Sequence, residues 1–171
     1  MRFDARDAEC VVFVEREGVL RRIGHDVKLT VRSFWIDMEA ERVEASFDAS
    51  SLEVSAAMVE GREEGSLLSD RDKAEIADHV KTDVLNARKH SAITFVSQSI
   101  TQDSEDTCTI AGTLMLCGAK RAVTLNAKRT GKTWVAECAL HQPDFGIRPF
   151  SAMLGALKVK PTVRVRVSVP S

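Results

Sequence analysis

Residues 163–169 constrain the fold more than any other stretch because their side chains alternate in polarity without a break. The segment reads VRVRVSV, with valine at each odd position and arginine or serine at each even position. Side chains on a β-strand point alternately to opposite faces, so this stretch predicts a strand with one buried and one solvated face. A single strand cannot bury its apolar face alone, and the rest of the chain must therefore supply a sheet.

Seven further segments carry strand patterns of the same kind. In the clearest of them, Val27, Leu29 and Val31 share a face with His25, and charged or polar residues lie between them. Such alternation is typical of a half-buried antiparallel sheet. The eight predicted strands cover residues 10–15, 25–32, 43–48, 93–100, 107–116, 123–127, 133–140 and 162–169.

One segment changes to a helical period. Ile76, Val80 and Val84 recur every four residues, and charged side chains fill the opposite side. Ser69 precedes the segment and is a good N-cap, and the aspartates that follow it suit the positive end of a helix dipole. The pattern predicts one α-helix over residues 70–86, between the third and fourth strands.

Eight antiparallel strands predict an all-β fold that closes into a barrel, because closure removes the exposed sheet edges. Many inward positions carry Val, Ala, Gly, Thr or Cys, which would leave room for a small ligand; the same residues also fit a tightly wound sandwich. The 171 residues are enough for one domain with a substantial core. We therefore expect a single domain over residues 1–171.

The segment before the last strand is apolar but cannot form a long regular element. Gly146, Pro149 and Gly155 interrupt any long helix or strand. We expect a crossing segment that plugs one end of the barrel. Its apolar side chains are those of Phe145, Ile147, Phe150, Met153, Leu154 and Leu157.

Charge and hydropathy exclude several classes of function. The net charge is −1, from 24 basic and 25 acidic residues, whereas nucleic-acid-binding proteins usually carry a basic excess. No run of about 20 apolar residues suits a membrane span, and no signal peptide is recognisable, so a cytoplasmic location is expected.

The four cysteines match no zinc or CxxC spacing and are expected to be free thiols. They are Cys10, Cys108, Cys117 and Cys138.

The most reactive combination of neighbouring residues is His25 and Asp26. An imidazole beside a carboxylate can act as a base or bind a metal, but the pair also suits the mouth of a strand, with Asp26 hydrogen-bonded to a loop. The other histidines, His79, His90 and His141, show no metal-binding spacing. No catalytic residues, metal or cofactor are therefore predicted.

Several motifs, taken in order, resemble the YceI-like family of lipocalin-like proteins. They are GHDVKLTV, FDASSLEV, SDRDKAEIADHVKTDVLNARKHSAITF, TLMLCGAKRAV and DFGIRPFSAMLGALKVKPTVRVRV. The resemblance runs over roughly residues 7–169. It implies an eight-stranded antiparallel lipocalin-like barrel that binds a polyisoprenoid, a fatty-acyl lipid or a similar long apolar molecule inside.

This hypothesis assigns ligand contacts to the barrel wall and to the crossing segment. Arg148 and Lys158 flank that segment and would contact an anionic head group. Two alternatives stay open: an enzyme that uses His25 and Asp26, and a structural or partner-binding domain with a filled barrel. A homodimer is also left open. The expected ligand contacts are Val27, Leu29, Phe47, Phe95, Leu114, Val123, Phe145, Phe150 and Val165.

Overall fold

The computed structural model describes residues 1–17, 25–152 and 157–171. Twelve strands form one sheet in the order β1-β5-β6-β9-β10-β11-β12-β15-β2-β4-β7-β8, and neighbouring strands are antiparallel throughout. The strands of this sheet are β1 (Arg2–Asp4), β2 (Glu9–Val14), β4 (Asp26–Val31), β5 (Phe34–Met38), β6 (Val43–Asp48), β7 (Leu52–Val59), β8 (Arg62–Glu64), β9 (Ala92–Ser104), β10 (Thr107–Leu116), β11 (Ala119–Thr130), β12 (Thr133–His141) and β15 (Thr162–Pro170).

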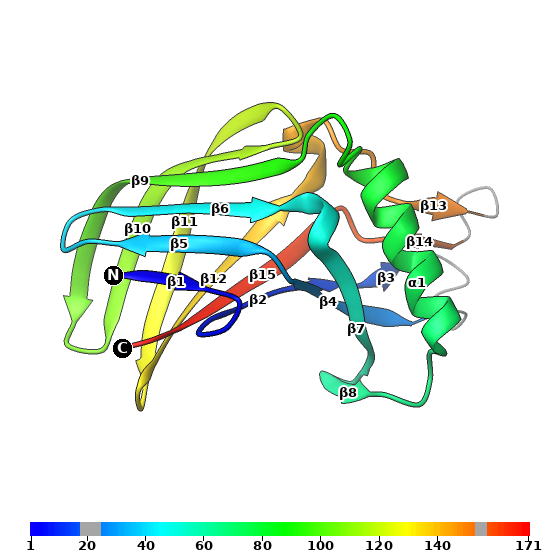
Figure 1. Cartoon of the computed structure of the whole chain (residues 1–171), viewed down its shortest axis with the longest axis horizontal. Helices are drawn as coiled ribbons and strands as arrows, with labels where there is room; N and C mark the ends of the chain where they lie inside the picture. The colour runs from blue at the N-terminus through cyan, green and yellow to red at the C-terminus, as the bar shows by residue number, and fades with distance from the viewer. Residues whose placement is uncertain (18–24, 153–156) are drawn as a thin grey trace.

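Three short strands form a second sheet beside the barrel, in the order β13 (Ser151–Ala152), β14 (Leu157–Val159) and β3 (Arg16–Glu17). The helical elements are α1 (Asp70–His79), the π-helical turn η2 (Val80–Val84), and two 3-10 turns, η1 (Ala49–Ser51) and η3 (Gln142–Phe145). Figure 1 shows the long strands side by side, with α1 at one end and both chain termini at the other.

Two bent strands close the sheet into a barrel. β4 continues into β5, and β6 continues into β7 through η1; β4 pairs with β7, and β5 pairs with β6. Backbone hydrogen bonds cross the bend, from Arg32 N to Ser51 O (3.2 Å) and from Asp48 N to Ser33 O (2.9 Å). β4–β5 and β6–β7 therefore act as two long bent strands. The first pairs with β2, and the second pairs with β9.

With each bent pair counted once, the ring has the predicted eight strands: β2, β4–β5, β6–β7, β9, β10, β11, β12 and β15. The all-β, lipocalin-like barrel is confirmed, and each of the eight predicted segments overlaps one strand of this ring. The sequence prediction missed the second halves, β5 and β7, and the short strands β1, β3, β8, β13 and β14. These short strands pair at edges or outside the ring, so their side chains alternate too briefly to show a period.

The predicted helix is confirmed and begins where the cap predicts. Ser69 Oγ accepts a hydrogen bond from Asp72 N, and the Asp72 carboxylate accepts one from Ser69 N, both at 3.1 Å. This capping box lowers the pKa of Asp72 because Ser69 donates to its charged form. Helical structure continues through η2 to Val84, two residues short of the predicted end.

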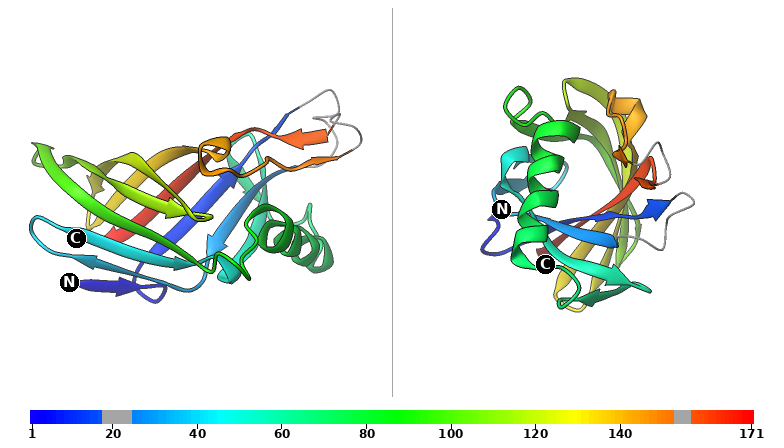
Figure 2. Two further views of the ribbon diagram at one scale, coloured as in Figure 1. Left: turned by 90° about the horizontal axis from the view of Figure 1, so that it is seen from above. Right: turned by 90° about the vertical axis from the view of Figure 1, so that its right-hand side faces the viewer.

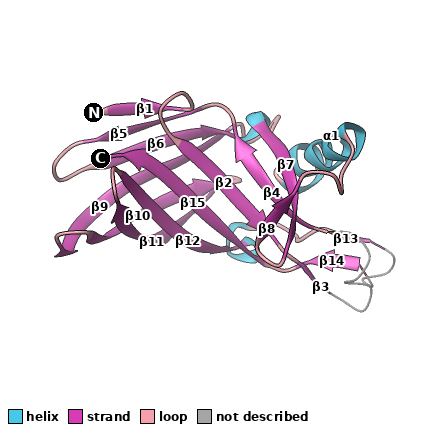
Figure 3. Cartoon of the chain, turned by 90° about the horizontal axis from the view of Figure 1, so that it is seen from below, coloured by secondary structure: helices cyan, strands magenta, loops and turns pink. Residues whose placement is uncertain are grey.

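The helix lies across one open end of the barrel. Viewed from that end, α1 passes in front of the ring of strands (Figure 2). Figure 3, from below, shows the strands running obliquely toward α1, with the N- and C-termini at the opposite end. The barrel therefore has one end covered by the helix and another formed by hairpin turns.

Candidate functional site

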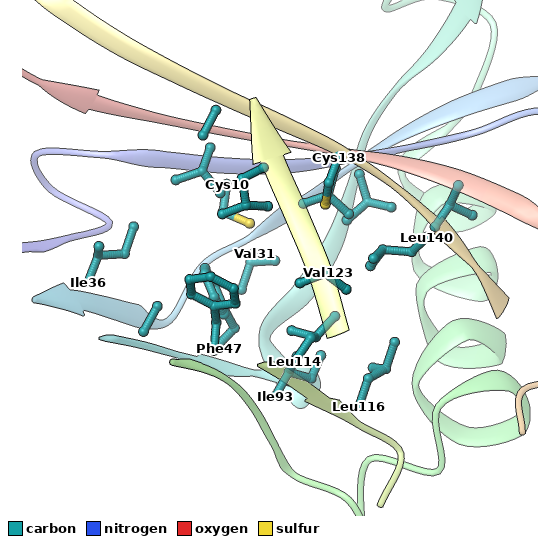
Figure 4. A pocket seen from close by; sticks show the side chains of 18 of the residues that line it. Cys10, Val31, Ile36, Phe47, Ile93, Leu114, Leu116, Val123, Cys138 and Leu140 are labelled. Atoms are coloured by element: carbon teal, nitrogen blue, oxygen red, sulfur yellow. The ribbon is translucent and has the colours of Figure 1, made fainter. Parts of the chain in front are cut away.

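The barrel encloses an apolar cavity of about 520 Å³ (Figure 4). It runs from the helix-covered end, where Ile76 and Val80 line it, to the opposite end, where Met38 and Gln102 line it. Cavities of 300–1,000 Å³ with mainly hydrophobic walls are typical of small-molecule sites. The barrel is hollow, so the structure does not favour the alternative of a filled structural domain.

Strand periodicity produces the apolar wall. All four valines at the odd positions of residues 163–169 line the cavity, as the alternation predicts. In β10, the lining residues Cys108, Ile110, Leu114 and Leu116 are likewise two or four residues apart. Every strand of the ring contributes its buried face in this way, so no single motif in the sequence marks the site.

Gly112 shares the inward face of β10 and makes room for an aromatic ring. A Cβ atom on Gly112 would lie 2.5 Å from Phe95 Cζ and 2.5 Å from the backbone oxygen of Val96. Both are far inside van der Waals contact, so only glycine leaves space for the Phe95 ring at this position. The ring then borders the cavity without filling it.

Eight of the nine expected contact residues line the cavity. Phe145 does not: it is buried in η3 and packs in the core beside the wall. Its burial reflects the 3-10 turn, which the alternation of the strands does not predict. The eight that line the cavity are Val27, Leu29, Phe47, Phe95, Leu114, Val123, Phe150 and Val165.

The helix-covered end combines apolar and polar side chains. His79 and Phe150 both line the cavity, and their ring centroids lie 6.0 Å apart. Phe150 is 37% exposed, so it stands at the rim. His79 Nδ1 lies 2.7 Å from the Asp83 carboxylate, one helical turn away. Of the expected crossing segment, Met153 and Leu154 lie outside the described residues.

The two expected head-group residues lie outside the cavity. Arg148 is exposed, and Lys158 Nζ lies 3.3 Å from the Glu17 carboxylate, an ion pair between β14 and β3. Neither residue lines the cavity. A contact between these cations and a ligand therefore requires a head group that reaches beyond the rim.

His25 and Asp26 do not face the cavity either. Asp26 Oδ1 accepts a hydrogen bond from the backbone N of Arg16 at 2.8 Å, and the guanidinium of the same residue lies 3.7 Å away. Asp26 thus ties the start of β4 to β3, whereas the structural interpretation of this pair expected a hydrogen bond to a loop. In residues 1–17, 25–152 and 157–171, no three His, Cys, Asp or Glu side chains are placed to hold a metal ion.

Three of the four cysteines line the cavity, a feature that spacing motifs could not reveal. Cys10 and Cys138 point into it (Figure 4), and Cys108 lines it further along β10. Burial raises the pKa of the Cys10 thiol to about 12 and that of Cys138 to about 11. Both thiols therefore stay protonated near neutral pH and contribute as small apolar wall residues.

Cys10 and Cys138 are also too far apart to form a disulfide. All four cysteines are free. β15 lies between β12, which carries Cys138, and β2, which carries Cys10, so these strands are about 9.5 Å apart. A disulfide needs Cα atoms within about 7 Å.

No helix in the part of the chain that the structure describes is long and apolar enough to cross a membrane. No curated protein matches the sequence.

Solved structures share the fold at low sequence identity. BcnA of Burkholderia cenocepacia aligns with a TM-score of 0.69 at 13% identity, over 98% of both chains. A Campylobacter jejuni YceI protein aligns with a TM-score of 0.58 at 13% identity, over 80% of this chain and 77% of that one.

A third similar structure is described as a polyisoprenoid binding domain from Saccharophagus degradans implicated in plant cell wall breakdown. It aligns with a TM-score of 0.58 at 10% identity, over 96% of this chain and 94% of that one. At these identities the likeness concerns the fold alone. The family model of the YceI-like domain, in contrast, matches residues 11–170 of the sequence. The chain therefore belongs to the YceI-like family.

Proposed function

We propose that the protein binds or carries a long apolar ligand, a polyisoprenoid or a similar fatty-acyl lipid, inside the barrel. The observation that carries this proposal is the cavity of about 520 Å³, whose wall is almost wholly apolar. Transfer of apolar surface from water into such an environment is favourable by about 25 cal/mol per Å². A hydrocarbon chain therefore gains more binding free energy in this cavity than a polar ligand, which would find few hydrogen-bond partners there.

The shape of the cavity favours a chain over a compact molecule. Its wall includes the valines of β15 from Val163 to Val169, which span about 20 Å at roughly 3.3 Å per residue. A volume of this size stretched over that length suits an extended ligand. The description of the Saccharophagus degradans domain as polyisoprenoid binding supports the same ligand class.

The eight expected residues that line the cavity are proposed ligand contacts. Arg148 and Lys158 stay proposed contacts for an anionic group outside the rim, and their alanine variants should then weaken binding of a charged lipid only.

The cytoplasmic location and a homodimer also stay predictions. Cell fractionation tests the first, and light scattering coupled to size-exclusion chromatography tests the second.

Native mass spectrometry of freshly purified protein tests the proposal directly. We expect a bound mass that disappears after organic extraction and is recovered in the organic phase as an apolar lipid. Stripped protein should then bind added prenol or fatty alcohol. Failure of stripped protein to bind any long-chain lipid would overturn the proposal.

Fluorescence provides an independent measurement. The chain has two tryptophans. Trp134 lines the cavity, whereas Trp35 of β5 stacks against the guanidinium of Arg2. In a Trp35→Phe variant, Trp134 is the sole tryptophan. Its emission should change on titration with lipid and saturate at one ligand per chain.

A further inference from the structure

The helix that covers one end of the barrel (Figure 2) makes its hydrogen bonds and ion pairs within its own segment. Arg71 Nε lies 3.1 Å from Glu75 Oε1, and His79 Nδ1 lies 2.7 Å from Asp83 Oδ2. No hydrogen bond or ion pair joins α1 or η2 to a described residue outside 69–87. The helix can therefore move away from the barrel without breaking a polar interaction with it.

Apolar side chains hold the helix over the cavity. Ile76, Val80 and Val84 line the cavity and pack against the core of the barrel, and Ala77 beside them is buried. Exposure of these side chains to water is unfavourable, so the covering position is preferred. Because such contacts are non-directional, the helix can leave and return without rebuilding a hydrogen-bond network.

The two ends of the helical segment are attached in different ways. After η2, the Cys117 thiol donates to the backbone oxygen of Leu85 at 3.4 Å, and Ala87 is buried. Before α1, residues 59–67 are all exposed, and a Cβ on Gly65 would meet nothing within 4 Å. Hinges are a few residues at the ends of elements that absorb changes in φ and ψ. The segment is thus anchored at its C-terminal end and loosely joined at its N-terminal end.

The helix meets the opposite rim of the barrel through an aromatic contact. The ring centroids of His79 and Phe150 lie 6.0 Å apart, both side chains line the cavity, and both are partly exposed. Phe150 itself is fixed, because its backbone oxygen accepts a hydrogen bond from Val159 N at 3.0 Å. The ring contact therefore lies between an element that can move and a rim that is held in place.

The other end of the barrel is closed by backbone hydrogen bonds instead. Glu39 and Gln102 line the cavity there. Glu39 N donates to Arg42 O at 2.8 Å across the β5–β6 turn, and Met38 N donates to Met1 O at 2.7 Å. An opening at this end would break such bonds, which is costly wherever the groups are left unpaired. Displacement of the helix is the less costly way to open the cavity.

We propose that α1 and η2 form a lid that swings about its anchor at residues 85–87 and lets the ligand pass between His79 and Phe150. This inference rests on the proposed function, because a lid needs a ligand to pass. It concerns the path of exchange and holds for any apolar molecule that the cavity takes up. Entry and release then both require the lid to open.

A tether across the mouth tests this requirement. In a His79→Cys/Phe150→Cys double variant, a short bis-methanethiosulfonate reagent links the helix to the rim, and a reductant cuts the link again. Transfer of tritiated geranylgeraniol from loaded protein to empty phosphatidylcholine vesicles should almost stop in the linked protein and resume after reduction. Each single variant treated with the same reagent is the control, and its release rate should not change on reduction.

The native thiol of Cys138 reports opening of the lid without any lipid. This thiol points into the cavity (Figure 4), so N-ethylmaleimide must enter the barrel to reach it. Its alkylation, followed by mass spectrometry of the Cys138 peptide, should slow in the linked protein and recover once the link is cut and the reductant removed. Cys117 does not line the cavity, and its alkylation should stay the same.

Phe150→Ala tests the lid in the opposite direction because it removes the ring contact. For one aromatic pair, release of geranylgeraniol and alkylation of Cys138 should both become about two- to tenfold faster. A mere loss of ligand contact would speed release but leave the alkylation of lipid-free protein unchanged. Val96→Ala is the matched control, since Val96 is another exposed apolar side chain, on β9, that does not line the cavity. Both rates should stay the same in this control.

The outcomes separate the lid from the function on which it rests. If the parent protein binds neither geranylgeraniol nor another long-chain lipid, the proposed function is wrong, and alkylation of Cys138 still decides whether the helix opens. Unchanged release from the linked protein, or alkylation of Cys138 that the link does not slow, would overturn the lid. If the reagent fails to bridge the two thiols, an unchanged rate of alkylation in Phe150→Ala would overturn it alone.

Discussion

At the scale of single residues, the cavity depends on positions where a side chain is missing or uncharged. Gly112 leaves space for the Phe95 ring, and the thiol of Cys10 stays neutral because it is buried. Each of these properties is a local cause of an empty, apolar interior, and each can be changed alone.

Gly112→Ala should destabilise the protein and disturb the cavity. The new Cβ would lie 2.5 Å from Phe95 Cζ and from the backbone oxygen of Val96, so the Phe95 ring must move into the cavity or the strand must shift. Overpacking of this kind costs about 1–3 kcal/mol, which a lower urea midpoint would reveal. Gly65→Ala is the matched control, because a Cβ there meets nothing within 4 Å, and its midpoint should change little. Equal midpoints for the two variants would contradict this account of Gly112.

Stability should fall as pH rises above about 9, partly because of Cys10. Its pKa rises from 9.0 to about 12 on folding, so the unfolded thiol ionises first and the folded state loses its advantage between these two pH values. The loss from this thiol approaches about 1.4 kcal/mol per pH unit within that window. Urea unfolding at pH 8, 9 and 10 measures the slope, which should be shallower in Cys10→Ala. An identical slope in that variant would show that the thiol does not contribute.

At the scale of elements, two faces decide what the cavity can hold: the inward face of β10 and the inner face of α1. Leu114 lies on the first, and Ile76 lies on the second, which Val80 continues into η2. The strand sets the width of the cavity, and the helix covers its end.

Leu114→Trp should reduce lipid binding much more than it reduces stability. The indole extends into a cavity of about 520 Å³, so it has space to occupy, but it takes volume that the ligand needs. The urea midpoint of the stripped protein and the retention of a labelled isoprenoid should be measured side by side. Met115→Trp, on the other face of the same strand, should keep retention. A midpoint drop corresponding to several kcal/mol with unchanged retention would mean that the interior is packed rather than open.

Ser69→Ala should loosen the helix and speed exchange of the ligand. The substitution removes the hydroxyl that accepts from Asp72 N at the start of α1, a loss of about 1 kcal/mol for a typical N-cap. Amide hydrogen exchange in α1 and the release rate of bound lipid should both rise. Faster amide exchange with an unchanged release rate would indicate that the ligand leaves by another path.

At the scale of the whole molecule, the barrel is a closed ring with two different ends. Closure leaves β1 and β8 as the ends of the main sheet, outside the ring of long strands. The ligand-binding volume is thus shared by the whole ring, and folding and cavity formation are one event. The expectation of a single domain over residues 1–171 stays a prediction, which a single cooperative urea transition would support.

Removal of the ligand should lower the thermal midpoint of the whole protein. A ligand that binds only the folded state adds stability of about 2.7 kcal/mol when its free concentration is a hundred times its Kd. Scanning calorimetry of protein before and after organic extraction, and after readdition of prenol, measures this shift. Equal midpoints in all three samples would contradict lipid binding to the folded barrel.

The sequence by itself determined the class of fold, the helix and which side chains face inward. Alternation in the ring strands and the four-residue period of Ile76, Val80 and Val84 are local properties that a single chain segment displays. The Ser69 cap is equally local. For the same reason, the phase of the strands alone placed the seven expected wall residues at the cavity, whereas Phe150 was assigned from the apolar crossing segment.

Only the tertiary structure decided that the barrel is hollow, how it closes and where its polar atoms lie. The bends that join β4 to β5 and β6 to β7 depend on hydrogen bonds between segments distant in sequence, such as Asp48 N to Ser33 O. The carboxamide of buried Gln142 likewise depends on Lys160, 18 residues away, whose backbone oxygen accepts a hydrogen bond from its Nε2. A sequence pattern reports the face on which a side chain lies, but the volume between facing strands and the partners across it exist only after the ring has closed.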